Sequence, residues 1–428
     1  MRVGFLFEKW NYYRVFGPIV ERALERGHET ECWHDLKTLP KGPKATKSPD
    51  TMPTFRHGQP RLRTFQDEAD LRAQLAVDAP DVMVALARPA GAGEGLRMRW
   101  FGLQYTIDAA SLLTPAGAPR FDALGLHSRY WADHVAACLR INAFNRSSST
   151  ARAPEPVDEA AVAEVVKRLG VVVGTPEMDQ VHRFDPAALR AKFGLEPERP
   201  VVLYIPFPFK SNPDPFWVRH VYGGGSDTLR RLRVWWRGDA RYREHAARGL
   251  TDRGTVEAVR AFCDANGAAL VVKARDKDPV PRYLAGQADL VLGDEAYYPA
   301  TILELLRISS LCLHFFSTVA YEAAYAGVPS LCVAPDLEDL GFPPMWREWF
   351  LNLDEGNSWN FPGVVYPVTL EEVVRELPRR RITDVPLEPA ARAQYVERFV
   401  GFDDGKSSDR VLDILQSLAE GAPGGAAA

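Results

Sequence analysis

Short apolar segments alternate with amphipathic helical segments twice along this chain, and this alternation restricts the fold more than any other feature. In the first run, the apolar segment 2–7 precedes helical spacing over 14–26, and a second strand pattern follows at 28–33. Such strand–helix–strand units build parallel sheets. A second run of the same kind begins at residue 201. The sequence therefore predicts an α/β protein with two doubly wound domains, which we expect to face one another across a cleft.

The remaining elements continue the same two runs. The first run predicts further strands at 81–86, 99–105 and 121–126 and a helix at 129–141. The second run predicts strands at 201–206, 269–274, 289–293, 310–315 and 329–334 and helices at 255–266, 301–308 and 318–326. Helices are also expected at 370–377, 389–399 and 407–419.

Changes in composition set the expected domain boundaries. We expect an amino-terminal domain over 1–180 and a carboxyl-terminal domain over 181–400, followed by a closing helix over 401–420. The glycine- and alanine-rich end, 421–428, is expected to be a disordered tail.

Three polar or basic segments interrupt these elements. Residues 37–66 hold seven lysines and arginines against one acidic residue, and residues 145–156 are polar and contain prolines, so we expect both to be loops. The insertion 207–253 combines tryptophans and tyrosines with many arginines, which suits a peripheral contact with a membrane surface or an anionic polymer. The alternative for this insertion is an amphipathic helix whose tryptophans pack on the domain.

Composition excludes several classes of function. The net charge is −4 and no nucleic-acid-binding module is visible, so we expect no nucleic-acid partner. No apolar run approaches the roughly 18 residues of a membrane span, and the first charged residues come too early for a signal peptide. Five scattered cysteines predict buried free thiols in a reducing cytoplasm. No cluster of metal ligands is visible, so we expect a cytoplasmic protein with no obligatory metal and no cofactor.

The segment 309–334 carries the strongest functional signal. An apolar strand ends at His314, and the pair Ser317 and Thr318 opens an alanine-rich helix. A helix amino terminus offers free N–H groups and a dipole that favours an anion such as a diphosphate. Glu322 lies one turn further on, where its carboxylate can accept hydrogen bonds from a ribose diol. The alternative is an ordinary helix cap beside a surface glutamate.

Two cations are expected at the same edge of the sheet. Lys273 and Arg275 come at the end of the strand 269–274 and, as alternate residues, point the same way. Together with a helix amino terminus they form a coherent phosphate clamp, and a solvated strand end is the alternative. Tyr298 follows the next strand, and its ring can stack on a nucleotide base.

Five motifs in a fixed order resemble a known family. They are GTPEMDQV (174–181), the segment 186–210, the cationic strand end, the segment 302–331 and DDGKSSDRVLDIL (403–415). This order resembles the carboxyl-terminal half of GT-B transferases, in particular the CDP-glycerol glycerophosphotransferase-like group and, more distantly, the non-hydrolysing UDP-GlcNAc 2-epimerases. The resemblance implies a GT-B fold of two Rossmann-like domains and a nucleotide-diphosphate donor.

The resemblance also implies roles for individual residues. Ser317 and Thr318 would contact the pyrophosphate, and Glu322 the ribose. With the candidates named above, the donor-binding set is Lys273, Arg275, Tyr298, His314, Ser317, Thr318 and Glu322. The closing motif would include Gly405, Ser407 and Arg410.

The chain departs from the family at a position that matters for the reaction. The glycerophosphotransferase group carries a His-Gly pair after a strand of its first domain, with the histidine proposed as catalytic base. The corresponding segment here, RWFGLQYTIDAA (99–110), holds no histidine, and His127 belongs to the following unit. The departure favours glycosyl transfer, in which a carboxylate can accept the proton of the attacking hydroxyl.

Two carboxylates at strand ends are the catalytic candidates. Asp108 follows the strand at 99–105, and Glu8 follows the strand at 2–7. The alternatives are a helix cap for Asp108 and a surface ion pair for Glu8. If neither is the base, His127 or His314 would be next. The residues after Glu8, namely Lys9, Trp10 and Asn11, are the acceptor-binding candidates.

These expectations converge on a cytoplasmic GT-B glycosyltransferase of polysaccharide biosynthesis. Its partners would be a nucleotide-sugar donor on the second domain and a glycan or lipid-linked acceptor on the first, with peripheral contact to the inner membrane face through 207–253. The alternatives are a CDP-polyol phosphotransferase of teichoic-acid type, a non-hydrolysing nucleotide-sugar 2-epimerase and a degenerate nucleotide-binding module.

Overall fold

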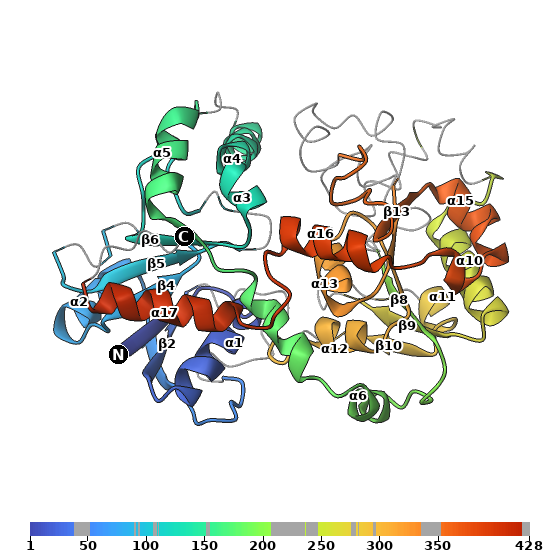
Figure 1. Cartoon of the computed structure of the whole chain (residues 1–428), viewed down its shortest axis with the longest axis horizontal. Helices are drawn as coiled ribbons and strands as arrows, with labels where there is room; N and C mark the ends of the chain where they lie inside the picture. Colours follow the sequence, from blue (N-terminus) through green and yellow to red (C-terminus); the bar gives the residue numbers. More distant parts are fainter. Residues whose placement is uncertain are drawn as a thin grey trace. The chain divides into compact units, whose positions relative to one another are not determined.

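The computed structural model describes most of the chain, and it contains two compact units (Figure 1). The described residues are 1–37, 52–89, 91–92, 95–105, 109, 111–150, 155–206, 236, 247–274, 280, 282–293, 297–334 and 352–421. Unit 1 comprises Met1–Arg183, Ala296–Ala300 and Val396–Ala428, and unit 2 comprises Phe184–Glu295 and Thr301–Tyr395. Each unit has its own parallel sheet and its own hydrophobic core.

A seven-stranded parallel sheet forms the centre of unit 1. In spatial order its strands are β3 (Arg61–Phe65), β2 (Glu29–Asp35), β1 (Arg2–Phe7), β4 (Val82–Ala85), β5 (Arg99–Leu103), β6 (Ala123–Leu126) and β7 (Gly170–Val172). Valine, leucine and phenylalanine fill the central strands and are fully buried, as in sheets that are covered on both faces. The strand order reverses between β1 and β4, which makes this point the switch point of a doubly wound sheet.

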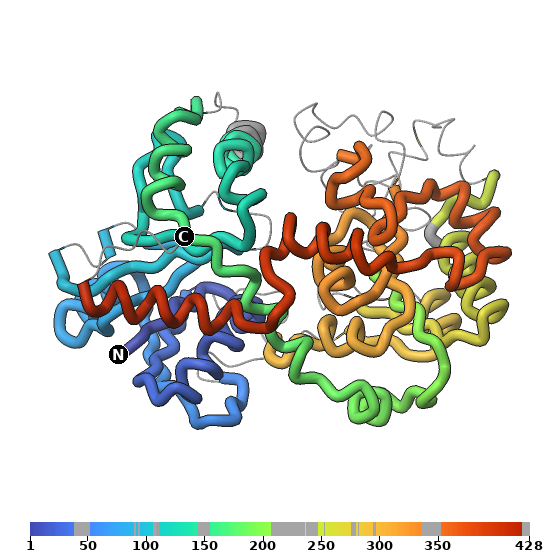
Figure 2. The backbone as a smooth tube through the Cα atoms, viewed as in Figure 1, coloured from blue at the N-terminus to red at the C-terminus, as the bar shows by residue number. Residues whose placement is uncertain are grey.

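Helices connect or follow the strands of unit 1. They are α1 (Tyr12–Glu25), α2 (Glu68–Val77), α3 (Arg129–Asp133), α4 (Val135–Thr150), α5 (Glu159–Leu169), the 3-10 helix η2 (Pro176–Arg183) and α17 (Ser407–Ala419). The last helix, α17, lies beside the first, α1, although they are far apart in the sequence (Figure 2). Arg22 of α1 and Arg26, which directly follows α1, form ion pairs with Asp409 of α17, which fixes this contact.

A buried carboxylate holds the amino terminus of α17. Asp179 of η2 is 2% exposed, and its carboxylate accepts hydrogen bonds from the backbone N–H groups of Ser407 (3.1 Å) and Ser408 (2.7 Å). Burial raises the pKa of Asp179, although these hydrogen bonds act in the opposite direction. The carboxylate thus satisfies two of the N–H groups that every helix leaves unpaired at its start.

Replacing Asp179 with Ala should lower the free energy of unfolding by about 2–4 kcal/mol, because two buried N–H groups lose a charged acceptor. Asp185 provides a matched control, since it caps α6 (Pro186–Lys192) through Ala187 N–H (3.1 Å) at an exposed site. Asp185→Ala should cost only about 1 kcal/mol. Urea unfolding of the full chain measures both, and equal small losses would contradict the role of Asp179.

A six-stranded parallel sheet forms the centre of unit 2. In spatial order its strands are β10 (Leu290–Leu292), β9 (Ala269–Lys273), β8 (Val201–Ile205), β11 (Leu311–His314), β12 (Ser330–Val333) and β13 (Val365–Val368). The order reverses between β8 and β11, so the sheet repeats the topology of the first six strands of unit 1. Its helices are α6, α10 (Asp252–Ala265), α11 (Arg282–Ala285), α12 (Thr301–Arg307), α13 (Val319–Ala326), α15 (Leu370–Arg375) and the first part of α16 (Pro389–Phe399).

Three expectations for unit 1 are wrong. Residues 61–65, expected within a loop, form β3, because Arg61 and Arg63 lie 3.7 and 3.5 Å from Glu31 of the neighbouring β2, which offsets their charge. The backbone of α4 continues to Thr150, so the first part of the expected loop, 145–150, is helical. The helix expected at 129–141 is divided into α3 and α4 at His134, whose Nδ1 lies 2.6 Å from the Tyr130 carbonyl oxygen.

The units also differ from the expected domain boundaries. Unit 1 takes in residues 296–300 and the chain from Val396 onward. We expected 296–300 and 396–400 in the carboxyl-terminal domain, and the closing helix and the tail as separate segments after it. A hydrogen bond from Ala300 N–H to the side chain of Gln180 (3.0 Å) helps to hold the first of these segments. The sequence patterns also do not predict α2, α5, η2, α6, α11, β7 and β13.

Two further properties bear on the expectations from composition. All five cysteines are buried and free, as predicted. Within the described ranges, no helix has the length and apolar character that crossing a membrane requires.

Candidate functional site

The switch point of unit 2 lies between β8 and β11, whose last residues Ile205 and His314 are paired in register. Doubly wound sheets bind ligands at the carboxyl ends of their strands at such a point. After His314 the chain passes through a short turn that contains Ser317 and Thr318 and then enters α13. The structure therefore brings three donor-binding candidates together at this edge.

The turn before α13 leaves polar groups available to a ligand. The side chains of Ser317 and Thr318 are half-buried. Thr318, at the amino-terminal cap position of α13, makes no side-chain hydrogen bond to the helix, and Val319 N–H reaches Ser317 Oγ only at 3.4 Å. The N–H groups of Ala320 and Tyr321 donate to the carbonyl oxygens of Ser317 (3.0 Å) and Thr318 (3.1 Å). The first turn of α13 is thus weakly capped by side chains, and the Thr318 hydroxyl and the positive end of the helix dipole suit an anion.

His314 is fully buried and uncharged at the same edge. Burial lowers its pKa to about 3. Its Nδ1 accepts a hydrogen bond from Ser317 N–H (3.4 Å), so the single proton of the neutral ring lies on Nε2. Nε2 has no hydrogen-bond partner among the described residues. A buried N–H without an acceptor is costly, and an oxygen atom of a ligand would satisfy it.

The cationic part of the expected donor site is described only in part. Lys273 is the last residue of β9, which neighbours β8, and its side chain is half-buried. Its Nζ donates to the carbonyl oxygen of Ala274 (2.9 Å). Arg275 lies outside the described residues, so the two-cation clamp stays a prediction.

Glu322 is not a surface residue. It lies on α13 with only 3% exposure. Burial and, after it, the negative charge of Glu322 raise the pKa of the Cys312 thiol on β11, so Glu322 lies close to the sheet. Contact with a ribose stays a prediction for this residue.

Tyr298 belongs to unit 1, whereas the other described donor-binding candidates belong to unit 2. Its hydroxyl donates to Glu21 of α1 (3.2 Å), and its ring lies 5.3 Å from that of Phe55. Gly17 allows this close approach, since a Cβ atom there would lie 2.4 Å from the Tyr298 ring. Tyr298 therefore packs on α1, and its contact with a donor base stays a prediction.

Glu8 occupies the switch point of unit 1, directly after β1. Burial is the first cause of a raised pKa of Glu8, and the charge of Asp35 at the end of β2 adds to it. A long hydrogen bond from the Tyr12 hydroxyl (3.4 Å) and the charge of Lys9 act in the opposite direction without cancelling the rise. A carboxylate with a raised pKa at a strand end is suited to accept a proton near neutral pH.

The residues beside Glu8 form an aromatic and polar surface. Asn11 donates a hydrogen bond to the hydroxyl of Tyr105, which follows β5, and the Tyr105 ring lies 5.8 Å from that of Tyr12. The Trp10 ring lies 5.5 Å from His34, while Lys9 is exposed. The structure thus places the three acceptor-binding candidates together next to Glu8, and their contact with an acceptor stays a prediction.

Of the remaining base candidates, Asp108 lies outside the described residues. His127 is described and lies after β6, and burial lowers its pKa to about 4. Its backbone N–H donates to the side chain of Gln104 (3.0 Å). A histidine with so low a pKa is a weak base, which leaves Glu8 as the described candidate best suited to the role.

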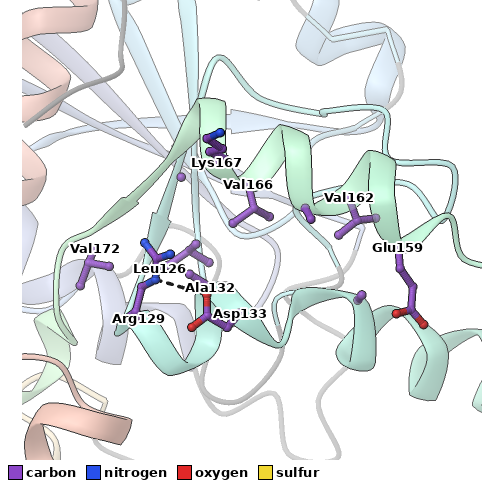
Figure 3. A pocket seen from close by; sticks show the side chains of 12 residues that line it. Leu126, Arg129, Ala132, Asp133, Glu159, Val162, Val166, Lys167 and Val172 are labelled. Carbon is purple, nitrogen blue, oxygen red and sulfur yellow. Dashed lines mark ion pairs between the residues drawn. The ribbon is translucent and has the colours of Figure 1, made fainter.

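A pocket of about 450 Å³ lies elsewhere in unit 1, between α3, α4 and α5 (Figure 3). Its lining combines apolar side chains such as Leu126 and Val166 with the charged Arg129 and Lys167. Arg129 forms an ion pair with Asp133 across 3.2 Å. The pocket contains none of the predicted site residues.

Solved structures show the fold of this chain. No protein-family model and no curated protein matches the sequence. The wall teichoic acid polymerase TagF matches with a TM-score of 0.55 at 15% identity, covering 98% of this chain and 89% of TagF. A TagF variant soaked with CDPG gives a TM-score of 0.53 at 14% identity, with coverage of 98% and 89%.

A protein from Listeria monocytogenes that is assigned as a UDP-N-acetylglucosamine 2-epimerase matches as well, with a TM-score of 0.50 at 12% identity, covering 99% of this chain and 98% of that protein. At these identities the likeness defines the fold. The chain has the GT-B fold, with two Rossmann-like units, as the sequence predicts.

Proposed function

We propose that this protein transfers a sugar from a nucleotide-diphosphate donor to a hydroxyl group of a glycan, glycolipid or lipid-linked acceptor. Unit 2 binds the donor, and unit 1 binds the acceptor and supplies the base. The observation that carries the proposal is the switch point of unit 2, where the unpartnered Nε2–H of His314 adjoins the weakly capped turn at Ser317 and Thr318. Several hydrogen-bond donors at one strand edge suit a diphosphate, the group common to all such donors.

In the proposed reaction, the acceptor hydroxyl attacks the anomeric carbon and the bond from that carbon to the diphosphate breaks. Negative charge develops on the departing diphosphate, where donor groups that are already in place are most effective. The hydroxyls of Ser317 and Thr318 and His314 Nε2–H supply such donors, and the positive end of the α13 dipole adds to them. Glu8 takes up the proton of the hydroxyl, and Asp108 is the second candidate for this role. No step of this scheme requires a metal ion.

The solved structures support a nucleotide-linked substrate for this chain. A TagF variant was soaked with CDPG, and the Listeria protein is assigned to a UDP-linked sugar. These ligands belong to those proteins, and we carry over only their common part, a nucleoside diphosphate. The assay described below identifies the nucleotide base and the transferred group.

We also propose that the insertion 207–253 contacts a membrane that carries the acceptor. The structure describes only residue 236 and residues 247–253 of this insertion. Trp236 is 82% exposed, which supports contact with another surface rather than packing on unit 2.

Transfer of a polyol phosphate is the second candidate, favoured by the fold shared with TagF. The strand that would carry the His-Gly pair leads instead to Tyr105, so a base of that kind is missing there. Epimerisation of a nucleotide sugar is a third candidate, because the Listeria protein has the same fold. The released product distinguishes the three reactions.

We expect the full chain to release a nucleoside diphosphate from one nucleotide sugar, and only when an acceptor is present. The assay offers UDP-, CDP-, GDP-, ADP- and dTDP-linked glucose and CDP-glycerol, with and without a membrane lipid extract and an oligosaccharide mixture. Release of CMP from CDP-glycerol would instead indicate polyol phosphate transfer. A change in the sugar without an acceptor would indicate epimerisation. Either of these results would overturn the proposal.

A further inference from the structure

Phe316 has the most unusual backbone at the switch point of unit 2. Its φ angle is +38°, and among the described residues it is the only non-glycine residue with a positive φ. An L-residue with a bulky side chain rarely adopts this left-handed region, which a glycine enters at little cost. A phenylalanine kept in a conformation that favours glycine needs an explanation from its side chain.

The surroundings of Phe316 hold both its backbone and its ring in place. Its backbone forms a hydrogen bond with the thiol of Cys332 on β12. Its ring stands edge-on to Trp359, with ring centroids 5.9 Å apart and an interplanar angle of 88°. Trp359 is buried at 3% exposure and lies 6.1 Å from His314 as well. The Phe316 ring is half-buried, so part of it stays accessible.

Phe316 lies next to the residues that are proposed to bind the donor diphosphate. It lies between His314 and the Ser317–Thr318 turn, where the proposed function places the diphosphate. Phe316 directly precedes this turn, and its half-buried ring leaves an apolar surface beside the position proposed for the diphosphate. A group attached to the diphosphate can therefore contact this ring.

We propose that Phe316 is the residue that selects the transferred group, and that its ring is an apolar platform for one face of a pyranose. This inference rests on the proposed function and names the substrate class of that site. A pyranose ring presents several C–H groups on one face, and these pack against the electron-rich face of an aromatic ring. An open-chain polyol phosphate has no such face, so the platform favours sugars over polyols.

The test compares two ligands of the same base on the full chain by calorimetric titration. Each of UDP, CDP, GDP, ADP and dTDP is titrated, followed by its glucose conjugate. For the nucleotide base that binds, Phe316→Gly should lower the affinity for the nucleotide sugar by about 2- to 12-fold and leave the affinity for the nucleoside diphosphate unchanged. Phe316→Tyr keeps the ring and should retain both affinities.

The melting temperature separates this role from a structural one. Glycine accepts the positive φ angle at position 316, which offsets part of the loss of the ring contact with Trp359, so Phe316→Gly should remain folded and unfold in a single transition. An equal loss of affinity for both ligands, or no loss for either, would overturn the inference. If no nucleoside diphosphate binds the wild type, the proposed function itself fails, and the two failures are therefore distinguishable.

Discussion

Replacing Glu8 with Gln should lower turnover by about 10²- to 10⁴-fold while donor binding remains, because the amide keeps the shape of the side chain but cannot accept the hydroxyl proton. Glu8 is suited to this role by its place at the switch point of unit 1 and by burial and the nearby Asp35, which raise its pKa. Turnover is measured as acceptor-dependent release of the nucleoside diphosphate.

The pH profile provides an independent readout of the same group. The active form of Glu8 is the carboxylate, so kcat/KM should fall as the pH drops through the raised pKa of Glu8, above its ordinary value of 4.5. Glu29→Gln is a matched control, since Glu29 is an exposed residue at the opposite end of the strands, at the start of β2. It should leave both turnover and the profile unchanged.

Near-normal turnover of Glu8→Gln would contradict this assignment. Asp108→Asn is then the next variant, because Asp108 is the other carboxylate that the sequence predicts as the base. Loss of turnover in Asp108→Asn alone would move the base to that residue. Neither result would affect the assignment of the donor site, which lies in unit 2.

Most of the fold could be predicted because its signals are local. Each central strand of the two sheets is a short apolar run, and each following helix shows apolar residues at helical spacing. β3 was missed because Arg61 and Arg63 make its sequence polar, and the partner that offsets their charge, Glu31, lies in another strand. Local periodicity cannot reveal such a cross-strand pair.

The candidate site could be predicted only where its residues follow one another in the sequence. His314, Ser317 and Thr318 lie within five residues of one another, so a single strand–helix junction identifies them. Trp359 comes from a distant segment, and no local pattern links it to His314 or Phe316. The conformation of Phe316 was also unforeseen, because nothing in the letters HFFST marks a positive φ angle.

Tyr298 has a contact that its local sequence does not reveal. Its place after a predicted strand suggests stacking on the donor base, which stays a prediction, and the buried carboxylate of Glu21 holds its hydroxyl on α1. Glu21 also accepts hydrogen bonds from the backbone N–H groups of Arg56 and His57, so it holds this segment against α1 as well. A glutamate inside a helix gives no sequence signal for such a role.

The double variant with Ser317→Ala and Thr318→Ala should bind a nucleoside diphosphate about 5- to 150-fold more weakly than the wild type, which corresponds to about 1–3 kcal/mol for lost hydrogen bonds to a charged group. Both hydroxyls lie at the weakly capped start of α13, so their removal changes the anion site with little change in the fold. Ser309→Ala is a matched control, because Ser309 lies before β11 and donates to the Leu305 carbonyl oxygen (2.7 Å). It should bind like the wild type.

Calorimetric titration of the full chain with UDP, CDP, GDP, ADP and dTDP tests the central claim most directly, namely that the switch point of unit 2 binds a nucleoside diphosphate. We predict that at least one of the five binds the wild type at one site, and that the double variant, but not Ser309→Ala, weakens this binding. Absence of binding to the wild type, or unchanged affinity in the double variant, would contradict the claim.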